Sequence, residues 1–445
     1  MTAFTALLLA FITGGDALGT AENLEIVYSG RLTPVAVAEG KATEKGFTVT
    51  WFLPRPTERP GEGLFVVSED AAALPWPARF GFSPLEGGED GPRIGYQFDN
   101  RDHIVPLPGV RVPFTEKITE AGEFIEGRLT VKLEEDKTID GYECRIFTVS
   151  GGPTRQETIA VDRESGMIVR FESDVFFGRG DRFRLTLNLT QATPLVEEST
   201  SREKIAVLLR KLADAMESTD RESGLDLSAE SLEQVALTQE SLVATAKGTP
   251  FEALAQAISR SVAEQRTRGT GIEELTKKVV GQPAPPLVLN DLDGQPIDPA
   301  AIKNKVVVLH FWDYDNDQLA TPYGQVGYLD HLHRQRGKLG VDVIGVAVNP
   351  RFADETQRAT AGRSTKKLIS FMNLTYPVVA DDGTLLRAIG DPRSLGARLP
   401  LWVVIGPDGV VRTYKSGLYE LKANEGLKEL DATVVELAKT RKNDD

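Results

Sequence analysis

Val306-Val-Val-Leu-His-Phe-Trp312 is the stretch that decides the fold of the C-terminal third of this chain. It is a short apolar run rich in β-branched residues, which is typical of a strand buried on both faces. Val341-Asp-Val-Ile-Gly-Val-Ala-Val348 has the same character, and residues 323–339 between the two runs have a helical pattern. A strand, a helix and a second strand of this kind predict a β-α-β unit, in which helices cover a sheet.

The α/β pattern continues to the end of the chain. Further strands are expected at residues 377–380, 401–405 and 410–414, and a further helix at 364–373. A closing helix is expected from Asn424, a good N-cap residue, to Thr440. Residues 279–445 are therefore predicted to form one α/β domain.

Short motifs around these strands occur in a recognisable order. They are Val280-Gly-Gln-Pro-Ala-Pro285, Asp293-Gly294, Tyr376-Pro377-Val378, Asp382-Gly383, Leu399-Pro400 and Val404-Ile-Gly-Pro-Asp-Gly409. With the first strand they make residues 279–445 resemble the TlpA-like and AhpC/TSA (peroxiredoxin-related) thioredoxin-fold domains. The resemblance implies a thiol-disulfide oxidoreductase or a peroxidase, with Pro400 as a cis-proline facing the active site.

The cysteines that this resemblance implies are absent. The family carries Cys-x-x-Cys, or one peroxidatic cysteine, on the first turn of the helix after the first core strand, where the helix N-terminus stabilises a thiolate. Direct counting places Asn316 and Leu319 at these positions, and alignment on Tyr328-Leu329 instead places Leu319 and Pro322 there. The chain has one cysteine, Cys144, which lies outside the domain. We therefore expect a degenerate redox site with no catalytic residue.

Aromatic residues beside the lost site suggest a different use for it. Trp312 and Tyr314, near Pro400, are predicted to form a peptide-binding groove, because the resemblance implies that substrate backbone is held beside the cis-proline. The alternative places Trp312 in the core of the sheet. Arg363, Arg393 and Arg398 are candidate anion contacts, unless they only solvate a face.

An acidic stretch follows the first strand. Asp313, Asp315 and Asp317 have the 1-3-5 spacing of a calcium loop, but Gln318 and Gly324 stand where the loop needs glycine and glutamate. The better interpretation is helix capping, in which aspartates accept hydrogen bonds from free backbone N–H groups. We expect no metal site, and no motif indicates a cofactor.

The first half of the chain, residues 22–198, has the pattern of an antiparallel β-rich domain. Thr158-Ile-Ala-Val-Asp162 and Met167-Ile-Val-Arg-Phe171 flank a glycine-containing turn and predict a hairpin. With Asp140-Gly-Tyr-Glu-Cys-Arg-Ile-Phe147, this hairpin resembles the LolA-like lipoprotein carriers, which implies a curved sheet around an apolar cavity. An unrelated β-sandwich is the alternative.

Residues 199–278 have the pattern of a helical linker subdomain. Ile205, Leu208, Leu209, Leu212 and Met216 share one face of a helix. A second helix is expected around residues 232–243, and Thr249-Pro-Phe-Glu252 is a capping box that begins a third. We expect short helices and a hinge at residues 266–271.

Residues 1–21 have the pattern of a signal peptide. The apolar run at residues 3–12 has the length of a signal-peptide core and is too short to span a bilayer, and small residues follow at Ala17, Gly19 and Ala21. We therefore expect an extracytoplasmic protein without a transmembrane span.

Three functions remain open from the sequence. A net charge of −14 disfavours nucleic-acid binding, because phosphates repel an acidic surface. The first hypothesis is a redox-inactive module that binds a protein or peptide partner or serves as a scaffold. The second is a thiol-disulfide oxidoreductase or peroxidase, as the resemblance implies. The third is a carrier of lipid or another apolar ligand through the β-rich domain.

Overall fold

The chain divides into two compact units, Met1–Ala263 and Glu264–Asp445. The structure, a computed structural model, describes residues 23–37, 42–54, 61–71, 74–88, 90–99, 101–112, 122–151, 156–178, 180–195, 199–216, 227–298, 302–313, 325–419, 421 and 426–441. The expected signal peptide lies outside these residues. In the part of the chain that is described, no helix is both long enough and apolar enough to cross a membrane.

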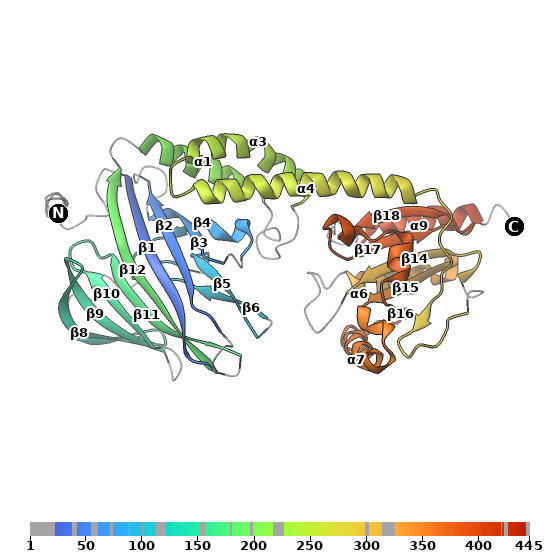
Figure 1. The fold of residues 1–445 in the computed structure, drawn as a ribbon, viewed down its shortest axis with the longest axis horizontal. Coiled ribbons are helices and arrows are strands. Elements are labelled where there is room, and N and C mark those ends of the chain that lie inside the picture. Colours follow the sequence, from blue (N-terminus) through green and yellow to red (C-terminus); the bar gives the residue numbers. More distant parts are fainter. Residues whose placement is uncertain are drawn as a thin grey trace. The chain divides into compact units, whose positions relative to one another are not determined.

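The first unit is built on one antiparallel sheet of ten strands in the order β4-β3-β2-β1-β12-β11-β10-β9-β8-β7 (Figure 1). The strands are β1 (Asn23–Ala36), β2 (Lys45–Leu53), β3 (Glu62–Glu69), β4 (Phe80–Pro84), β7 (Glu123–Glu126), β8 (Leu129–Ile139), β9 (Tyr142–Ser150), β10 (Gln156–Asp162), β11 (Ile168–Phe177) and β12 (Asp181–Leu195). Neighbours in the sheet are neighbours in sequence, except that β1 pairs with β12. The expected antiparallel domain is confirmed, as is the hairpin, which β10 and β11 form.

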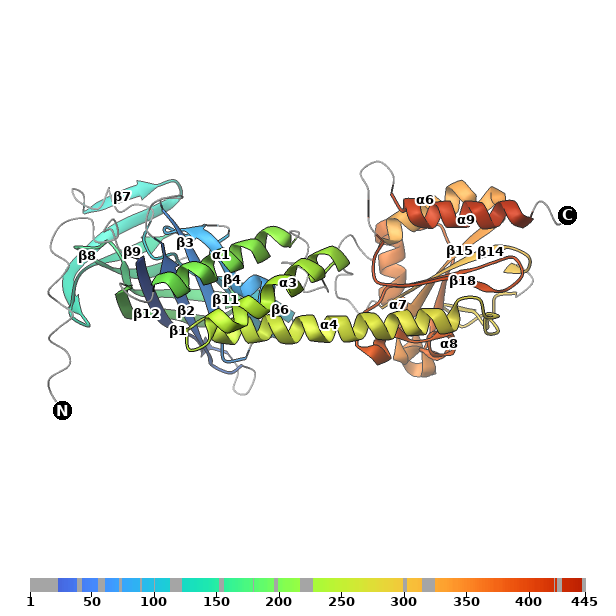
Figure 2. The same ribbon diagram turned by 90° about the horizontal axis from the view of Figure 1, so that it is seen from above.

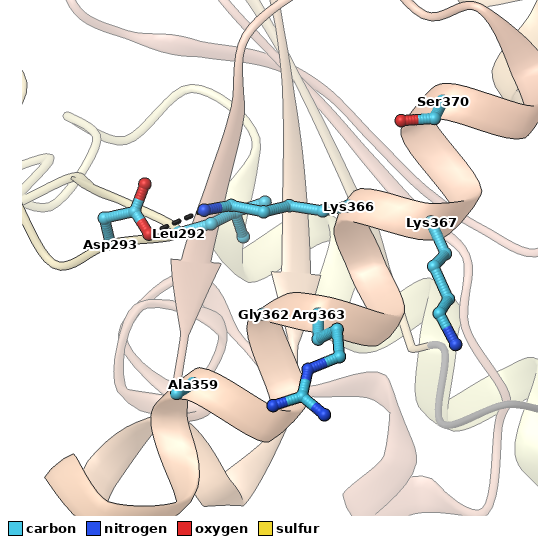
Figure 3. A pocket seen from close by; sticks show the side chains of 8 residues that line it. All are labelled: Leu292, Asp293, Ala359, Gly362, Arg363, Lys366, Lys367 and Ser370. Atoms are coloured by element: carbon cyan, nitrogen blue, oxygen red, sulfur yellow. Dashed lines mark hydrogen bonds and ion pairs between the residues drawn. The ribbon is translucent and has the colours of Figure 1, made fainter.

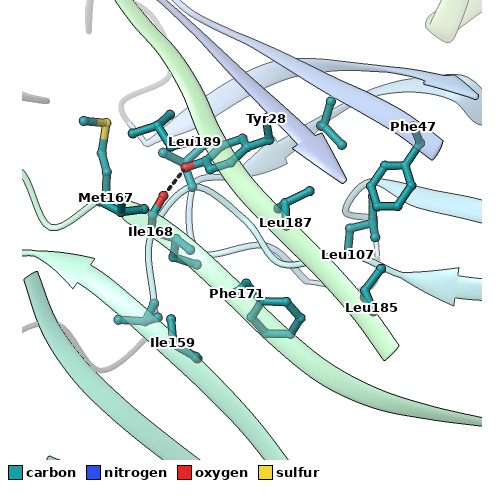
Figure 4. Packing of buried hydrophobic residues seen from close by; sticks show 14 of the residues in the cluster. Tyr28, Phe47, Leu107, Ile159, Met167, Ile168, Phe171, Leu185, Leu187 and Leu189 are labelled. Atoms are coloured by element: carbon teal, nitrogen blue, oxygen red, sulfur yellow. Dashed lines mark hydrogen bonds between the residues drawn. The ribbon is translucent and has the colours of Figure 1, made fainter. Parts of the chain in front are cut away.

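One face of this sheet buries a large apolar core. β5 (Arg93–Phe98) and β6 (Arg101–Pro106) form a separate hairpin whose Ile94, Tyr96 and Val105 belong to this core. Tyr28 lies within it, and its hydroxyl donates a hydrogen bond to the Ile168 carbonyl oxygen, 2.9 Å away (Figure 4). Burial raises the pKa of Tyr28 far above its usual value, so this hydroxyl remains a neutral donor.

Alternate side chains of β2 and β3 point to the other face, where helices cover them. Phe52, Leu64 and Val66 form a second core with α1 (Ser199–Ala215), α3 (Ala229–Ala246) and the first part of α4 (Glu252–Val279) (Figure 2). These strands are therefore buried on both faces, as their nearly continuous apolar sequences require.

Helix α4 begins at the predicted capping box but does not end at the predicted hinge. The Thr249 hydroxyl accepts a hydrogen bond from the Phe251 amide at 3.2 Å, and the Glu252 carboxylate accepts one from the Gly248 amide at 2.8 Å. The helix then continues for 28 residues, so the expectation of short helices and a hinge at residues 266–271 is wrong. Apolar burial on either side, by Ile258 and Val262 in one unit and Leu275 and Val279 in the other, outweighs the cost of about 1 kcal/mol for each helical glycine.

The second unit is the expected thioredoxin-like α/β domain. Its sheet has the order β13-β16-β15-β14-β17-β18, in which β14, β15 and β16 are parallel and the other pairs are antiparallel. The strands are β13 (Asn290–Asp291), β14 (Val306–Trp312), β15 (Val341–Val348), β16 (Val378–Asp381), β17 (Leu401–Ile405) and β18 (Val411–Ser416).

Helices cover both faces of this second sheet (Figure 2). α6 (Val326–Arg336) and α9 (Lys428–Arg441) bury Leu329 and Val434 against one face. α7 (Glu355–Met372) packs on the same face, where its Ile369 and Met372 contact that core, and α8 (Thr384–Ile389) and the end of α4 pack against the other. α7 begins nine residues before the expected helix at 364–373, because Asp354 caps it by accepting a hydrogen bond from the Thr356 amide at 2.8 Å.

Candidate functional site at the carboxyl edge of the parallel strands

The parallel strands β14, β15 and β16 end at one edge of the second sheet, where open α/β sheets place their ligand sites. β14 ends in Trp312, which Asp313 follows. β17 pairs antiparallel with β14 in a register that places Phe311 opposite Leu401, so the next residues, Trp312 and Pro400, are neighbours. Two of the three predicted groove residues are thus brought together, and the Leu399–Pro400 peptide bond is cis.

The remaining predicted site residues lie outside the described residues. They are Tyr314 of the groove, Asp315 and Asp317 of the acidic stretch, and the degenerate redox positions Asn316, Leu319 and Pro322. Asp313 is described and exposed. Across the described part of the chain, histidine, cysteine and acidic side chains nowhere gather in a group that could hold a metal ion.

Trp312 packs in the interior of the sheet. Its side chain is 1% exposed and contacts a small core that includes Phe352, Ala361 and Leu368, so it helps to hold α7 against β14 and β15. Gly345 makes room for it, because a Cβ atom there would lie 2.9 Å from the Tyr376 ring and 3.3 Å from the indole nitrogen of Trp312. Trp312 therefore belongs to the core of the sheet, as the alternative interpretation of the sequence predicted.

An aspartate–arginine pair stands beside this edge. The Arg393 guanidinium donates to both carboxylate oxygens of Asp391, at 2.9 and 2.7 Å, and the Arg393 amide donates to the same carboxylate at 3.0 Å. Burial raises the pKa of Asp391, but these hydrogen bonds and the positive charge outweigh it and hold the pKa below its usual value. The pair is therefore ionised, and it fixes the short turn before Pro400.

The pKa of Asp313 is shifted in the opposite direction from that of Asp391. Neighbouring protein atoms desolvate its carboxyl group and raise its pKa, while the charge of Arg393 works in the other direction. Its residue surface is nevertheless exposed, so water reaches part of the side chain.

The other polar groups at this edge have structural partners. The Asp381 carboxylate, at the end of β16, accepts hydrogen bonds from the amides of Leu385 and Leu386 at 3.0 and 3.1 Å and so caps α8. The Asn349 amide, at the end of β15, donates to the Asp381 carbonyl oxygen at 2.9 Å. These residues shape the edge and do not supply a nucleophile or a base.

The single thiol of the chain lies in the other unit. Cys144 is fully buried in β9, and its Sγ donates to the Tyr142 carbonyl oxygen at 3.5 Å. Burial, followed by the negative charge of Asp162, raises the pKa of the thiol to about 11. Cys144 therefore behaves as a small apolar core residue, and a reactive cysteine would need the opposite environment.

Sequence reasoning placed Arg393 at this site as a candidate anion contact but missed its partner. Asp391 precedes Pro392, and an aspartate before proline is a typical start of a helical turn, so the sequence did carry a signal. Arg398 is exposed, and Arg363 lies elsewhere, on α7. The capping role of Asp381 was missed as well, although the following Asp382-Gly383 turn was recognised.

Comparisons with known proteins agree with this architecture. Residues 280–414 match the model of the AhpC/TSA family. The thiol-disulfide oxidoreductase ResA of Bacillus cereus is 31% identical over 135 residues, which are 30% of this chain and 68% of that protein.

Solved structures of similar proteins include a thioredoxin-family thiol:disulfide interchange protein from Chlorobium tepidum TLS. It is 19% identical, with 36% of this chain and 97% of that chain covered and a TM-score of 0.28. A secreted Mycobacterium tuberculosis disulfide oxidoreductase homologous to E. coli DsbE is 21% identical, with 34% and 96% covered and a TM-score of 0.25.

Proposed function

The chain belongs to the AhpC/TSA family of thioredoxin-fold thiol-disulfide oxidoreductases, and from this premise we propose that its second unit works without a thiol, as a module that binds a protein or peptide. Thiol-disulfide exchange requires a thiolate that attacks a disulfide sulfur, and peroxide reduction likewise begins with a thiolate. A family member that lacks this group keeps the fold and its edge but not the reaction.

One observation carries the proposal: the only cysteine of the chain is Cys144. It lies in β9, in a core of a different unit, with its pKa raised to about 11. In both alignments of the family motif the cysteine positions are occupied by residues without a thiol, Asn316 and Leu319 or Leu319 and Pro322.

We place the binding surface at the carboxyl edge of the parallel strands. Trp312 and Pro400 are buried there, so a ligand would meet the groups around them: the exposed Asp313 and Arg398 and the half-buried Leu399 and Arg393. An apolar residue among charges of both signs suits an extended peptide, whose backbone offers donors and acceptors.

An insulin-reduction assay tests the absence of redox activity. With dithiothreitol as reductant, we expect the wild-type chain and Cys144→Ser to reduce insulin no faster than dithiothreitol alone. Asn316→Cys/Leu319→Cys and Leu319→Cys/Pro322→Cys restore the motif in the two alignments and serve as positive controls, one of which is expected to be active. Catalysis by Cys144→Ser would overturn the proposal.

Site-specific photo-crosslinking tests the binding surface. A benzoylphenylalanine residue at Arg398, in cells of the natural host, is expected to cross-link to a partner that the same residue at Lys439 does not reach. Lys439 is an exposed residue of α9, outside the residues of the proposed surface, and is the matched control. Identical cross-linked products from both positions would contradict a specific surface at this edge.

Export is a further part of the proposal. The apolar run at residues 3–12 and the small residues that follow support removal of residues 1–21. Mass spectrometry of the protein from fractionated cells is expected to find a new N-terminus near residue 22 outside the cytoplasm. Intact Met1 in the cytoplasmic fraction alone would contradict export.

We also propose the division into a β-rich domain at 22–198, a helical linker subdomain at 199–278 and a thioredoxin-like domain at 279–445. The core that α1, α3 and the first part of α4 share with β2, β3 and β4 supports a distinct helical layer. Limited proteolysis of the full chain is expected to cut first near residues 199 and 279. Early cleavage inside a domain would contradict these boundaries.

A further inference from the structure

Helix α7 forms one wall of a pocket in the second unit, away from the edge described above. The pocket has a volume of about 520 Å³ (Figure 3). Its helical wall presents Arg363, Lys366, Lys367 and Ser370, and its other wall is the turn that contains Leu292 and Asp293. Small-molecule sites typically have volumes of about 300–1,000 Å³, so the pocket is large enough for a small ligand.

A glycine on α7 allows the two walls to approach each other. A Cβ atom at Gly362 would lie 3.2 Å from the Leu292 carbonyl oxygen, which is tighter than an ordinary contact. The turn itself is held by Asp291, whose carboxylate accepts hydrogen bonds from the amides of Asp293 and Gln295 at 2.9 and 2.8 Å. The absence of a side chain at Gly362 and the Asp291 hydrogen bonds therefore help to shape the pocket.

The pocket is strongly cationic in a chain with a net charge of −14. Lys366 donates to the Asp293 carboxylate at 2.6 Å. Among the residues that the structure describes, no carboxylate lies within ion-pair distance of Arg363 or Lys367. These two cations are one helical turn apart, where like charges repel and weaken the helix. An anion between them would remove this repulsion.

The carboxylate of Asp293 is replaceable by a ligand. The Lys366 and Asp293 side chains are 51% and 69% exposed, and exposed ion pairs hold their partners weakly. An anionic ligand can therefore compete with Asp293 for Lys366, in a pocket that Arg363 and Lys367 also line, with the Ser370 hydroxyl as a further donor.

We propose that this pocket binds a small, multiply charged anion with closely spaced oxygens, of the phosphate or polycarboxylate class. The site is separate from the carboxyl edge and does not depend on the proposed peptide-binding function. Arg363 supplies two parallel donors for such oxygens, and the two lysines act as point charges.

Calorimetric titration of the full chain at low ionic strength tests the proposal, with inorganic pyrophosphate as one probe and citrate as the other. We expect at least one probe to bind, and the tighter of the two identifies the class. Arg363→Gln/Lys367→Gln is expected to weaken that binding at least about tenfold, because two charge-assisted contacts are lost. Binding should also weaken at physiological salt, which screens exposed charges.

Two further variants make the test specific. Lys338→Gln/Lys439→Gln removes the same charge from exposed positions that do not line the pocket and is expected to leave the affinity within about twofold of wild type, since neither side chain contacts the ligand. Asp293→Asn removes the internal competitor and is expected to tighten binding. No heat with either probe, equal loss in both double variants, or weaker binding by Asp293→Asn would overturn the proposal.

Discussion

The two units of the chain treat charged side chains in opposite ways. The first unit buries ion pairs: Lys45 and Glu69 are 7% and 0% exposed, and Arg202 and Glu25 are 8% and 6% exposed. In the described part of the second unit, the cation of every ion pair is at least 32% exposed. The first unit also has exposed pairs such as Arg31–Glu44, but among the described residues only this unit adds buried pairs with a structural role.

The buried ion pair between Lys45 and Glu69 connects three strands of the first unit. The Lys45 ammonium donates to the carbonyl oxygens of Ala71 and Gly95, at 2.7 and 2.5 Å, and Glu69 accepts from the Gly95 amide at 2.7 Å. Since Gly95 lies in β5, the pair attaches the β5–β6 hairpin to β2 and β3. A buried pair whose polar groups are all satisfied is costly to break, because the remaining charge has no water around it.

Removal of one buried partner should produce the largest effect on stability. Glu69→Gln leaves the Lys45 ammonium buried without its counter-ion, and we expect the free energy of unfolding of the first unit to fall by about 3–5 kcal/mol. Urea denaturation followed by tryptophan fluorescence measures this loss. A loss below about 1 kcal/mol would mean that the pair behaves like a surface pair and would remove the contrast between the units.

The next largest effect is expected in the rate at which the Cys144 thiol is labelled. A pKa of about 11, compared with 9.0 for an unperturbed thiol, leaves about a hundredfold less thiolate at pH 8. Labelling with Ellman's reagent is therefore expected to be at least about a hundredfold slower in the native chain than in guanidinium. Equal labelling rates in the native and the unfolded chain would show that β9 opens readily and that the first unit is not rigid.

Removal of an exposed partner should have a much smaller effect. Lys366→Met deletes the ion pair with Asp293, and we expect a change of less than about 1 kcal/mol in the stability of the second unit. The same denaturation experiment, carried out beside Glu69→Gln, gives the comparison directly. A loss of several kcal/mol would show that accessible pairs also hold this unit together.

Asp313 should give the smallest effect, with a defined dependence on pH. Its pKa is raised in the folded chain, so the ionised carboxylate costs stability above the folded pKa. This cost diminishes as the pH falls through the folded pKa and vanishes below the unfolded value of about 3.9. Asp313→Asn is therefore expected to raise the melting temperature slightly at pH 7 and to have no effect near pH 3. A lower melting temperature at pH 7 would contradict the direction of the shift.

The parts of the fold that were predictable are those that local sequence determines. β15 has the predicted limits, Val341–Val348, because a run of β-branched residues ends at Gly340 on one side and at the polar Asn349 on the other. The start of α4 was equally visible in the Thr249–Glu252 capping box. The continuation of α4 through Gly269 and Gly271 was not visible in the sequence. The apolar burial that outweighs the helix-destabilising effect of these glycines depends on residues far away in the sequence.

The same distinction applies to the candidate site. The absence of the family's cysteines could be read directly from the sequence, and so could the place of Pro400. The pairing of Trp312 with Pro400 depends on the register of β14 and β17, which no local pattern specifies. The cationic pocket depends on the approach of the turn at Leu292 to Gly362, so Arg363 could be named as an anion contact but not assigned to a site.

An open sheet of ten strands has two unpaired edges, and each edge exposes backbone groups to which a strand of another molecule could add. Here both edges are short: β4 has 5 residues and β7 has 4, whereas the eight strands between them have 7 to 15. β4 also ends in Pro84, which has no amide hydrogen to offer, and β7 begins with the exposed Glu123. Edges of this length offer few backbone groups to a strand of another molecule, which limits edge-to-edge association although the sheet stays open.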